Sequence, residues 1–93
     1  MNHYGAQMMR HWQAEHHQAY GELREPTKYF TQLGEEIAEQ VELRARSLAG
    51  VAPPGEGYLG RLQRLNTARL EAEGAIVREY LQQEPEAGET PVS

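Results

Sequence analysis

Arginines gather on both sides of one break in an otherwise helical sequence. Arg44 and Arg46 precede a segment rich in Pro and Gly, and Arg61 and Arg64 follow it. Guanidinium groups bind phosphates and carboxylates through a planar fork of N–H donors. A helix that begins near Arg61 would add free backbone N–H groups, which also favour anions. These four arginines are therefore candidate phosphate-contacting residues. The alternative is that they lie at a solvated helix end and bond the last carbonyls of the preceding helix.

A second set of polar residues interrupts an apolar helix pattern. Asn66, Arg69 and Glu73 follow one another at spacings of three and four residues, on the side that also carries leucines. Arg69 and Glu73 can pair along a helix at i,i+4. Half-buried charges need partners, because an unpaired charge costs several kcal/mol. The strip predicts either a polar network that fixes the register between helices or subunits, or a contact patch for a partner protein.

Histidines near the N-terminus are the weakest candidates for chemistry. His11 and Glu15 are spaced i,i+4 and could share a metal ion, but the adjacent His16 and His17 point about 100° apart and cannot both join them. The HExxH motif of zinc enzymes is absent. We therefore expect no metal site and no cofactor, and a metal-dependent enzyme ranks third among the alternatives.

Catalysis has few residues to use. The chain has no Cys and no Asp, and its serines are Ser47 and Ser93. Residues 55–60 show the glycine spacing G-x-G-x-x-G, but a dinucleotide-binding fingerprint needs a preceding strand, whereas a predicted helix and two prolines precede this one. The sequence therefore predicts a protein that is not an enzyme.

The elements that must position these residues are helices. Apolar residues recur at spacings of three and four and predict helices at about 5–20, 26–49 and 56–83. Pro26 suits the first turn of a helix, and Gly50 suits the residue just after one. A short loop makes the second and third helices antiparallel neighbours. The predicted fold is all-α: a long antiparallel helical hairpin with a shorter N-terminal helix packed across it.

The third helix carries two adjacent lines of mainly apolar residues, which make a wide face that we expect to be buried. The first line includes Leu59, Leu62 and Leu70, and the second includes Tyr58, Leu62 and Leu65. A face of this width usually contacts two partners. They would be the second helix and either the first helix or a second subunit, so a homodimer is one expectation. Gly34 and Gly74 should lie at similar heights near the far end of the hairpin, away from the break. Because glycine within a helix costs up to about 1 kcal/mol, we expect each to let a backbone or a ring approach closely, and our hypothesis is that Trp12 or Tyr20 of the first helix packs at this level.

Length and charge set the remaining expectations. The chain of 93 residues, with a net charge of −5, predicts one helical domain over 1–83 and a disordered acidic tail over 84–93. The net charge is −4 over 21–43, +4 over 44–70 and −5 over 71–93, so the hairpin has a basic turn end and an acidic far end. No apolar run is long enough to span a membrane and no signal peptide is evident, so we expect a cytoplasmic protein with no membrane partner.

The third predicted helix resembles a known family. Residues 65–79 read L-N-x-x-R-x-x-A-E-x-x-I-x-x-E, in which the matching residues are Leu65, Asn66, Arg69, Ala72, Glu73, Ile76 and Glu79. This segment resembles the C-terminal part of TnpV-like small proteins encoded in bacterial transposons and conjugative elements. The opening residues Tyr4, Gly5, Arg10, Trp12, His16 and Tyr20 loosely resemble that family's N-terminal pattern. The resemblance implies a mobile-element context, and it names no catalytic residue and no activity.

Two functions follow as expectations. The first is a non-enzymatic accessory or regulatory protein of a mobile genetic element that acts through protein–protein contacts. Its partner would be a second copy, or a protein of the element or the host. The acidic far end and the wide face of the third helix would make these contacts, including inhibitor-like binding to a basic surface. The alternative is a nucleic-acid-binding regulator that uses the arginines of the turn end.

Overall fold

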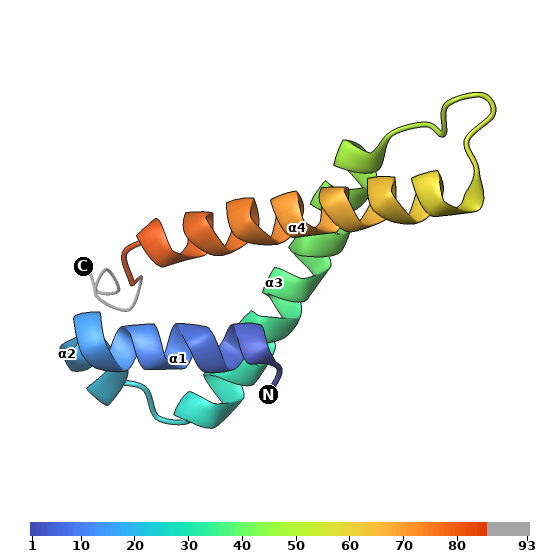
Figure 1. Cartoon of the computed structure of the whole chain (residues 1–93). Helices are drawn as coiled ribbons and strands as arrows, with labels where there is room; N and C mark the ends of the chain where they lie inside the picture. Colours follow the sequence, from blue (N-terminus) through green and yellow to red (C-terminus); the bar gives the residue numbers. More distant parts are fainter. Residues whose placement is uncertain (86–93) are drawn as a thin grey trace.

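The computed structural model describes residues 1–85, and every regular element within them is a helix. The helices are α1 (His3–Glu15), α2 (His17–Gly21), α3 (Pro26–Ala49) and α4 (Tyr58–Gln82) (Figure 1). The prediction of an all-α hairpin crossed by a shorter N-terminal helix is confirmed. The bounds of α3 agree with the sequence pattern, and α4 begins two residues later than expected. The predicted tail falls mainly on residues 86–93, which lie outside the described residues.

Contacts between side chains define the register of the hairpin. Arg64 of α4 bonds the carbonyl of Ala49, the last residue of α3, and Tyr80 near the end of α4 bonds Glu36. The two helices therefore run antiparallel. Since Arg64 is already level with the end of α3, the six residues 58–63 of α4 extend beyond it, and the loop 50–57 extends with them (Figure 1).

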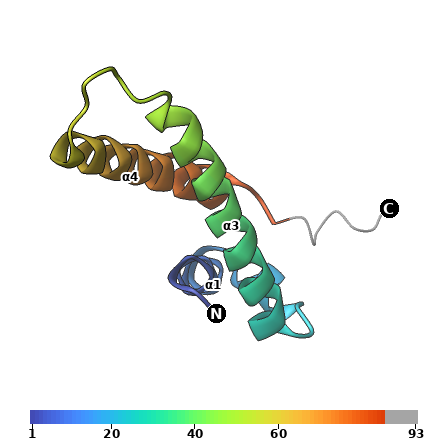
Figure 2. The same ribbon diagram turned by 90° about the vertical axis from the view of Figure 1, so that its right-hand side faces the viewer.

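The core lies where α1 and α4 both cover α3. Phe30, Ile37 and Val41 of α3 are fully buried, and the ring of Trp12 meets Phe30 edge to face with centroids 5.3 Å apart. From α4 the core receives Ala72 and Ile76, together with other side chains that are partly buried. Turned by 90°, the molecule shows α1 nearly end-on beside the first half of α3 (Figure 2). Burial of this kind is the main favourable term in folding.

The N-terminal helix differs from the prediction in two ways. It begins earlier, at His3, because the Asn2 side chain caps it and accepts a hydrogen bond from the backbone N–H of Gly5 at 2.9 Å. It also breaks at His16, whose φ of −137° and ψ of 49° are not helical. The break turns α2 back onto the core, so that Tyr20 stacks on Phe30 with centroids 6.1 Å apart. A continuous helix over 5–20 was therefore wrong.

The two helical glycines have opposite surroundings. A Cβ atom on Gly34 would lie 2.2 Å from Asn2 Oδ1 and 2.8 Å from the backbone nitrogen of Gly5, so α1 crosses α3 at this residue. Close approach at Gly34 is confirmed, although the neighbours are Asn2 and Gly5 rather than the rings of Trp12 or Tyr20. At Gly74 the prediction was wrong, because a Cβ atom there would meet only the guanidinium of Arg78, at 4.0 Å.

The resulting molecule is elongated, with extents of 56 × 25 × 19 Å. Across residues 1–85, no helix combines the length and the apolar character that crossing a membrane requires.

Candidate functional site

We call the end of α3, the loop 50–57 and the first turns of α4, together residues 44–65, the tip. Arg64 holds it together. Its Nε and Nη2 atoms donate to the two carboxylate oxygens of Glu56 at 2.7 and 3.0 Å, and its Nη1 atom donates to the carbonyl of Ala49 at 2.8 Å. The Glu56 side chain is only 10% exposed, and the hydrogen bond from Arg64 lowers the pKa of its carboxyl group. Arg64 therefore bonds a terminal carbonyl of α3, which was the alternative to phosphate contact.

Arg44 is also engaged within the chain. Its Nη2 atom lies 3.2 Å from a carboxylate oxygen of Glu79, a residue near the other end of α4. Both side chains are exposed to solvent, so the pair contributes little to stability. The arginine nevertheless points along the hairpin toward its acidic end, and away from the other arginines of the tip.

A groove opens between the end of α3 and the start of α4. Its volume is about 380 Å³, and the residues that line it are Glu42, Ala45, Arg46, Ala49, Gly50, Arg61, Arg64, Leu65 and Arg69. Within residues 1–85, the side chains of Arg46 and Arg61 form no hydrogen bond and no ion pair. The structure thus brings three of the four candidate arginines to one groove, and it leaves two of them with their donors unused.

Several apolar side chains of the tip are exposed, and the sequence pattern did not predict this exposure. Val51 is 93% exposed, Tyr58 and Leu59 are each 74% exposed, and Leu65 on the groove wall is 38% exposed. The helical spacing had assigned Tyr58 and Leu65 to a buried face. Tyr58 is exposed because it lies in the part of α4 that extends past the end of α3, whereas Leu65 lines the groove with Ala45 and Ala49 of α3 and is only partly exposed. This exposure could have been predicted from the lengths of the two helices on either side of the loop.

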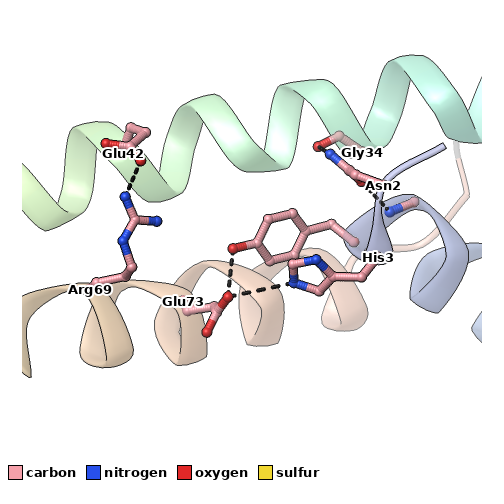
Figure 3. Close-up of polar contacts among 8 residues, drawn as sticks. Asn2, His3, Gly34, Glu42, Arg69 and Glu73 are labelled. Carbon is pink, nitrogen blue, oxygen red and sulfur yellow. Dashed lines mark hydrogen bonds and ion pairs between the residues drawn. The ribbon is translucent and has the colours of Figure 1, made fainter. Parts of the chain in front are cut away.

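The polar strip joins α4 to two different helices (Figure 3). Arg69 donates a hydrogen bond to Glu42 of α3. The hydroxyl of Tyr4 on α1 donates to Glu73 at 2.6 Å, and His3 Nε2 lies 3.6 Å from the same carboxylate oxygen. Burial raises the pKa of Tyr4 to about 12, and the hydrogen bond to Glu73 adds to the shift. Two residues of the predicted strip therefore act as a network between helices.

Asn66, the third residue of the strip, does not join this network, whereas Tyr80 and Glu36 form a further contact between α4 and α3. Asn66 is exposed, and its side chain makes no hydrogen bond with any other residue of the described range 1–85. Tyr80 donates to Glu36 at 2.5 Å, and burial together with this bond raises the pKa of the Tyr80 hydroxyl. The Tyr80–Glu36 contact was not predicted from the sequence, because it links residues of two helices that are far apart in the chain.

The histidines do not assemble into a site in the described structure. His11 and His16 meet edge to face with ring centroids 5.3 Å apart, whereas His3 lies against Tyr4 and Glu73. The Nε2 atom of His11 is buried and has no hydrogen-bond partner within residues 1–85. In the same range, no three His, Cys, Asp or Glu side chains converge closely enough to hold a metal ion.

Comparison of the chain with models of protein families, with curated proteins and with solved structures finds no match. The resemblance of residues 65–79 to TnpV-like proteins therefore stays a prediction from the sequence, and the function is argued from the geometry of the tip.

Proposed function

We propose that the protein is a non-enzymatic interaction module whose tip binds an acidic, partly apolar segment of a partner protein. The observation that carries this proposal is the groove at the tip, where Arg46 and Arg61 have unused donors beside Ala45, Ala49 and Leu65. A carboxylate in the groove would receive charge-assisted hydrogen bonds from the two guanidinium groups. An apolar side chain of the same segment would pack against the groove wall and against the exposed ring of Tyr58.

A protein partner fits this surface better than nucleic acid. Arg44, Arg64 and Arg69 are already paired with glutamates, which lowers the positive charge left for phosphates. Glu42 also lines the groove, and the chain as a whole carries a net charge of −5, so the tip lacks the extended positive surface that a run of backbone phosphates would need, whereas a single carboxylate needs only Arg46 and Arg61. Nucleic-acid-binding domains are usually basic. Exposed Val51, Tyr58 and Leu65 supply apolar area, which protein interfaces use at their centre.

The biological setting of this module is carried over from the resemblance alone. If the protein belongs to a mobile genetic element, its partner is a protein of that element or of the host, and the module acts as an accessory or regulatory subunit. The proposal about the groove does not depend on this setting.

The test is a titration with two labelled probes followed by fluorescence anisotropy. One probe is a synthetic helical peptide with a leucine stripe flanked by glutamates, and the other is a short DNA duplex. We expect the peptide to bind and a version with lysines in place of glutamates not to bind. The variant Arg46→Glu/Arg61→Glu should weaken peptide binding by at least about tenfold, which corresponds to 1.4 kcal/mol.

A matched control has the same change in net charge at the other end of the molecule. Arg10 and Arg24 are both exposed and lie away from the tip, so Arg10→Glu/Arg24→Glu should leave peptide affinity nearly unchanged. Equal weakening by both double variants would mean that only net charge matters, and it would reject the groove. Salt-sensitive binding of the duplex that is lost only in Arg46→Glu/Arg61→Glu, without peptide binding, would replace the proposal with the nucleic-acid alternative.

A further inference from the structure

One side of α4 is apolar, exposed and separate from the groove. Leu59 is 74% exposed, Leu62 is 39% exposed and Leu70 is 68% exposed. With Asn66 and Gly74 they follow one another at spacings of three and four residues, so they share one side of the helix. The helix buries Ala68, Ala72 and Ile76 on a different side. Contiguous apolar surface of this kind marks an interaction site more often than scattered exposed leucines do.

The glycine on this side is informative. Gly74 lies in the interior of α4, where glycine costs about 1 kcal/mol relative to alanine, yet a Cβ atom there would meet only the end of the flexible Arg78 side chain. No contact among residues 1–85 therefore explains the glycine. It lies in a shallow hollow of about 370 Å³ lined by His3, Tyr4, Gln7, Leu70, Glu73, Gly74 and Val77. A helix from outside the chain could approach closely at this hollow.

The residues along this side read almost the same in both directions from Leu70. Asn66 and Gly74 are each four residues away, Leu62 and Val77 are eight and seven away, and Leu59 and Leu81 are each eleven away. The bulkier Asn66 thus mirrors a glycine, and an exposed leucine mirrors a partly buried apolar residue at each further step. In a two-fold symmetric contact, residue i of one copy meets residue j of the other and j meets i, so an antiparallel pairing about Leu70 would place each exposed leucine against an apolar residue and Asn66 against Gly74.

Charge along the helix fits the same arrangement. Arg69 and Glu73 lie on either side of Leu70, so two antiparallel copies with Leu70 at the axis bring Arg69 of each copy toward Glu73 of the other. Arg69 bonds Glu42 through Nη2 and has further N–H donors, whereas Glu73 accepts from Tyr4 on Oε2 and retains Oε1. The same pairing would bring the first half of α4, whose charged residues are Arg61, Arg64 and Arg69, opposite its second half, which carries Glu71, Glu73 and Glu79 against Arg78.

From these observations we propose that two copies of the chain associate through α4, antiparallel and about a two-fold axis at Leu70. Leu59 and Leu62, which extend beyond α3 in one copy, contact Val77 and Leu81 of the other copy, and Asn66 lies over Gly74. The interface shares Arg69 with the groove wall but does not use Arg46 or Arg61, so dimer formation and partner binding can be tested separately.

The first test is the mass of the full chain by sedimentation equilibrium, from micromolar to near-millimolar concentration. We expect the mass to rise from the 10.5 kDa of one chain toward twice that value. A mass that stays at one chain throughout overturns the proposal. Binding of the acidic peptide by such a monomer would leave the proposed function standing, whereas a dimer that ignores the peptide would reject only the function.

Disulfide trapping tests the axis, since the chain contains no cysteine of its own. Leu70→Cys should form a covalent dimer rapidly under mild oxidation. Leu43→Cys is the matched control, because Leu43 is an exposed leucine in the middle of α3 and lies outside the proposed interface. Equal yields from the two variants would overturn the assignment.

The orientation is tested with cysteines near the two ends of α4. In the antiparallel arrangement Leu59→Cys should crosslink with Leu81→Cys when the two variants are mixed. Neither should crosslink efficiently with itself, because equivalent residues lie about 33 Å apart. Efficient self-crosslinking of Leu59→Cys would mean a parallel pair and would overturn the proposal.

Gly74→Gln should change the stability of the monomer and the affinity of the dimer in opposite directions, which a substitution that affected only the fold would not do. The monomer should become more stable, since glutamine is a good helix former and the position has free space. The dimer should dissociate about tenfold or more readily, because the side chain occupies the hollow. A dimer of unchanged affinity would remove Gly74 from the interface and contradict the proposal.

Discussion

The two ends of the molecule are built from similar residues but differ in what covers them. At the far end, α1 and α2 fold over the first half of α3, so Trp12 and Phe30 are almost fully buried. At the tip, Tyr58 and Leu59 of α4 extend past the end of α3 and stay 74% exposed. Both ends have aromatic and aliphatic side chains, and only the far end has a third layer of helix to bury them.

This difference separates stability from binding. Side chains at the far end contribute to the free energy of unfolding, since they leave water when the chain folds. Side chains at the tip stay largely in contact with water when the chain folds, so their burial can still stabilise a complex with a partner. We therefore expect substitutions to have large effects on stability at one end and large effects on binding at the other. Substitutions at the two ends can therefore test whether stability and binding are separated in this way.

The largest expected effect comes from truncating one aromatic residue at the far end. Phe30→Ala should lower the free energy of unfolding by about 3 to 5 kcal/mol, because it removes a fully buried ring and leaves a cavity. Leu59→Ala at the tip should change it by less than about 0.5 kcal/mol. Urea unfolding at low micromolar concentration measures both. A large loss in Leu59→Ala would show that the tip is part of the folded core.

The second comparison uses the two helical glycines. Gly34→Ala should cost about 1 to 3 kcal/mol, because the added methyl group would collide with Asn2 and with the backbone of Gly5. Gly74→Ala should raise stability by up to about 1 kcal/mol, since the added methyl group meets open space. Thermal unfolding followed by circular dichroism measures both. If the two variants shifted the melting temperature in the same direction, the close crossing at Gly34 would be contradicted.

A smaller effect should come from the network that joins α1 to α4. Tyr4→Phe removes the hydrogen bond to Glu73 and should cost about 1 to 2 kcal/mol at neutral pH. The folded state raises the pKa of Tyr4 from 10.0 to about 12, so the bonded phenol stabilises the fold fully below pH 10. That contribution is lost as the pH rises from 10 to 12.

The measurement for this prediction is urea unfolding across that alkaline range. Wild-type protein should lose stability as the pH rises, and Tyr4→Phe should lose less. Tyr80, whose pKa is also raised, contributes a loss of the same sign that Tyr4→Phe retains. Identical slopes for the two proteins would exclude a role for the Tyr4 hydroxyl.

The smallest effect distinguishes two neighbouring arginines at the tip. Arg64→Ala should lower the melting temperature measurably, because it releases Glu56 and the terminal carbonyl of α3 together. Arg61→Ala should leave the melting temperature unchanged, since the side chain of Arg61 makes no hydrogen bond or ion pair within residues 1–85. Equal melting temperatures for the two variants would mean that the hydrogen bonds of Arg64 do not stabilise the folded loop.

The sequence predicted the elements better than it predicted their surroundings. Spacing along the chain placed α3 within its observed bounds, because helix periodicity, Pro26 and Gly50 are local signals. The break at His16 was missed, because no Gly or Pro marks it and because the contact of Tyr20 with Phe30, which α2 makes after the break, joins residues that spacing along one helix does not relate. Spacing also assigned Tyr58 to a buried face, since it reports which residues share a side but not whether another helix is long enough to cover them.

The candidate site divides in the same way. Clustering of arginines at the turn was predictable from charge and from the position of the loop. Which of them remain available was not predictable, because that depends on Glu56 and Glu79, whose positions are set by the loop geometry and by the hairpin register. The polar strip was predicted to be either a network or a contact patch for a partner; Arg69 and Glu73 do bond other helices, but their partners Glu42 and Tyr4 lie far from the strip in the chain and could not be named from the sequence.

The elongated shape affects how the molecule moves through solution. Its radius of gyration is 16.9 Å, against about 12 Å for a compact chain of this length. A rod experiences more friction than a sphere of equal mass, so a single copy should elute early from a gel-filtration column and diffuse slowly. An antiparallel pair that overlaps along α4 would be thicker without doubling in length, and its frictional ratio should be lower than that of one copy. Association would therefore be recognised by a gain in mass together with a fall in asymmetry.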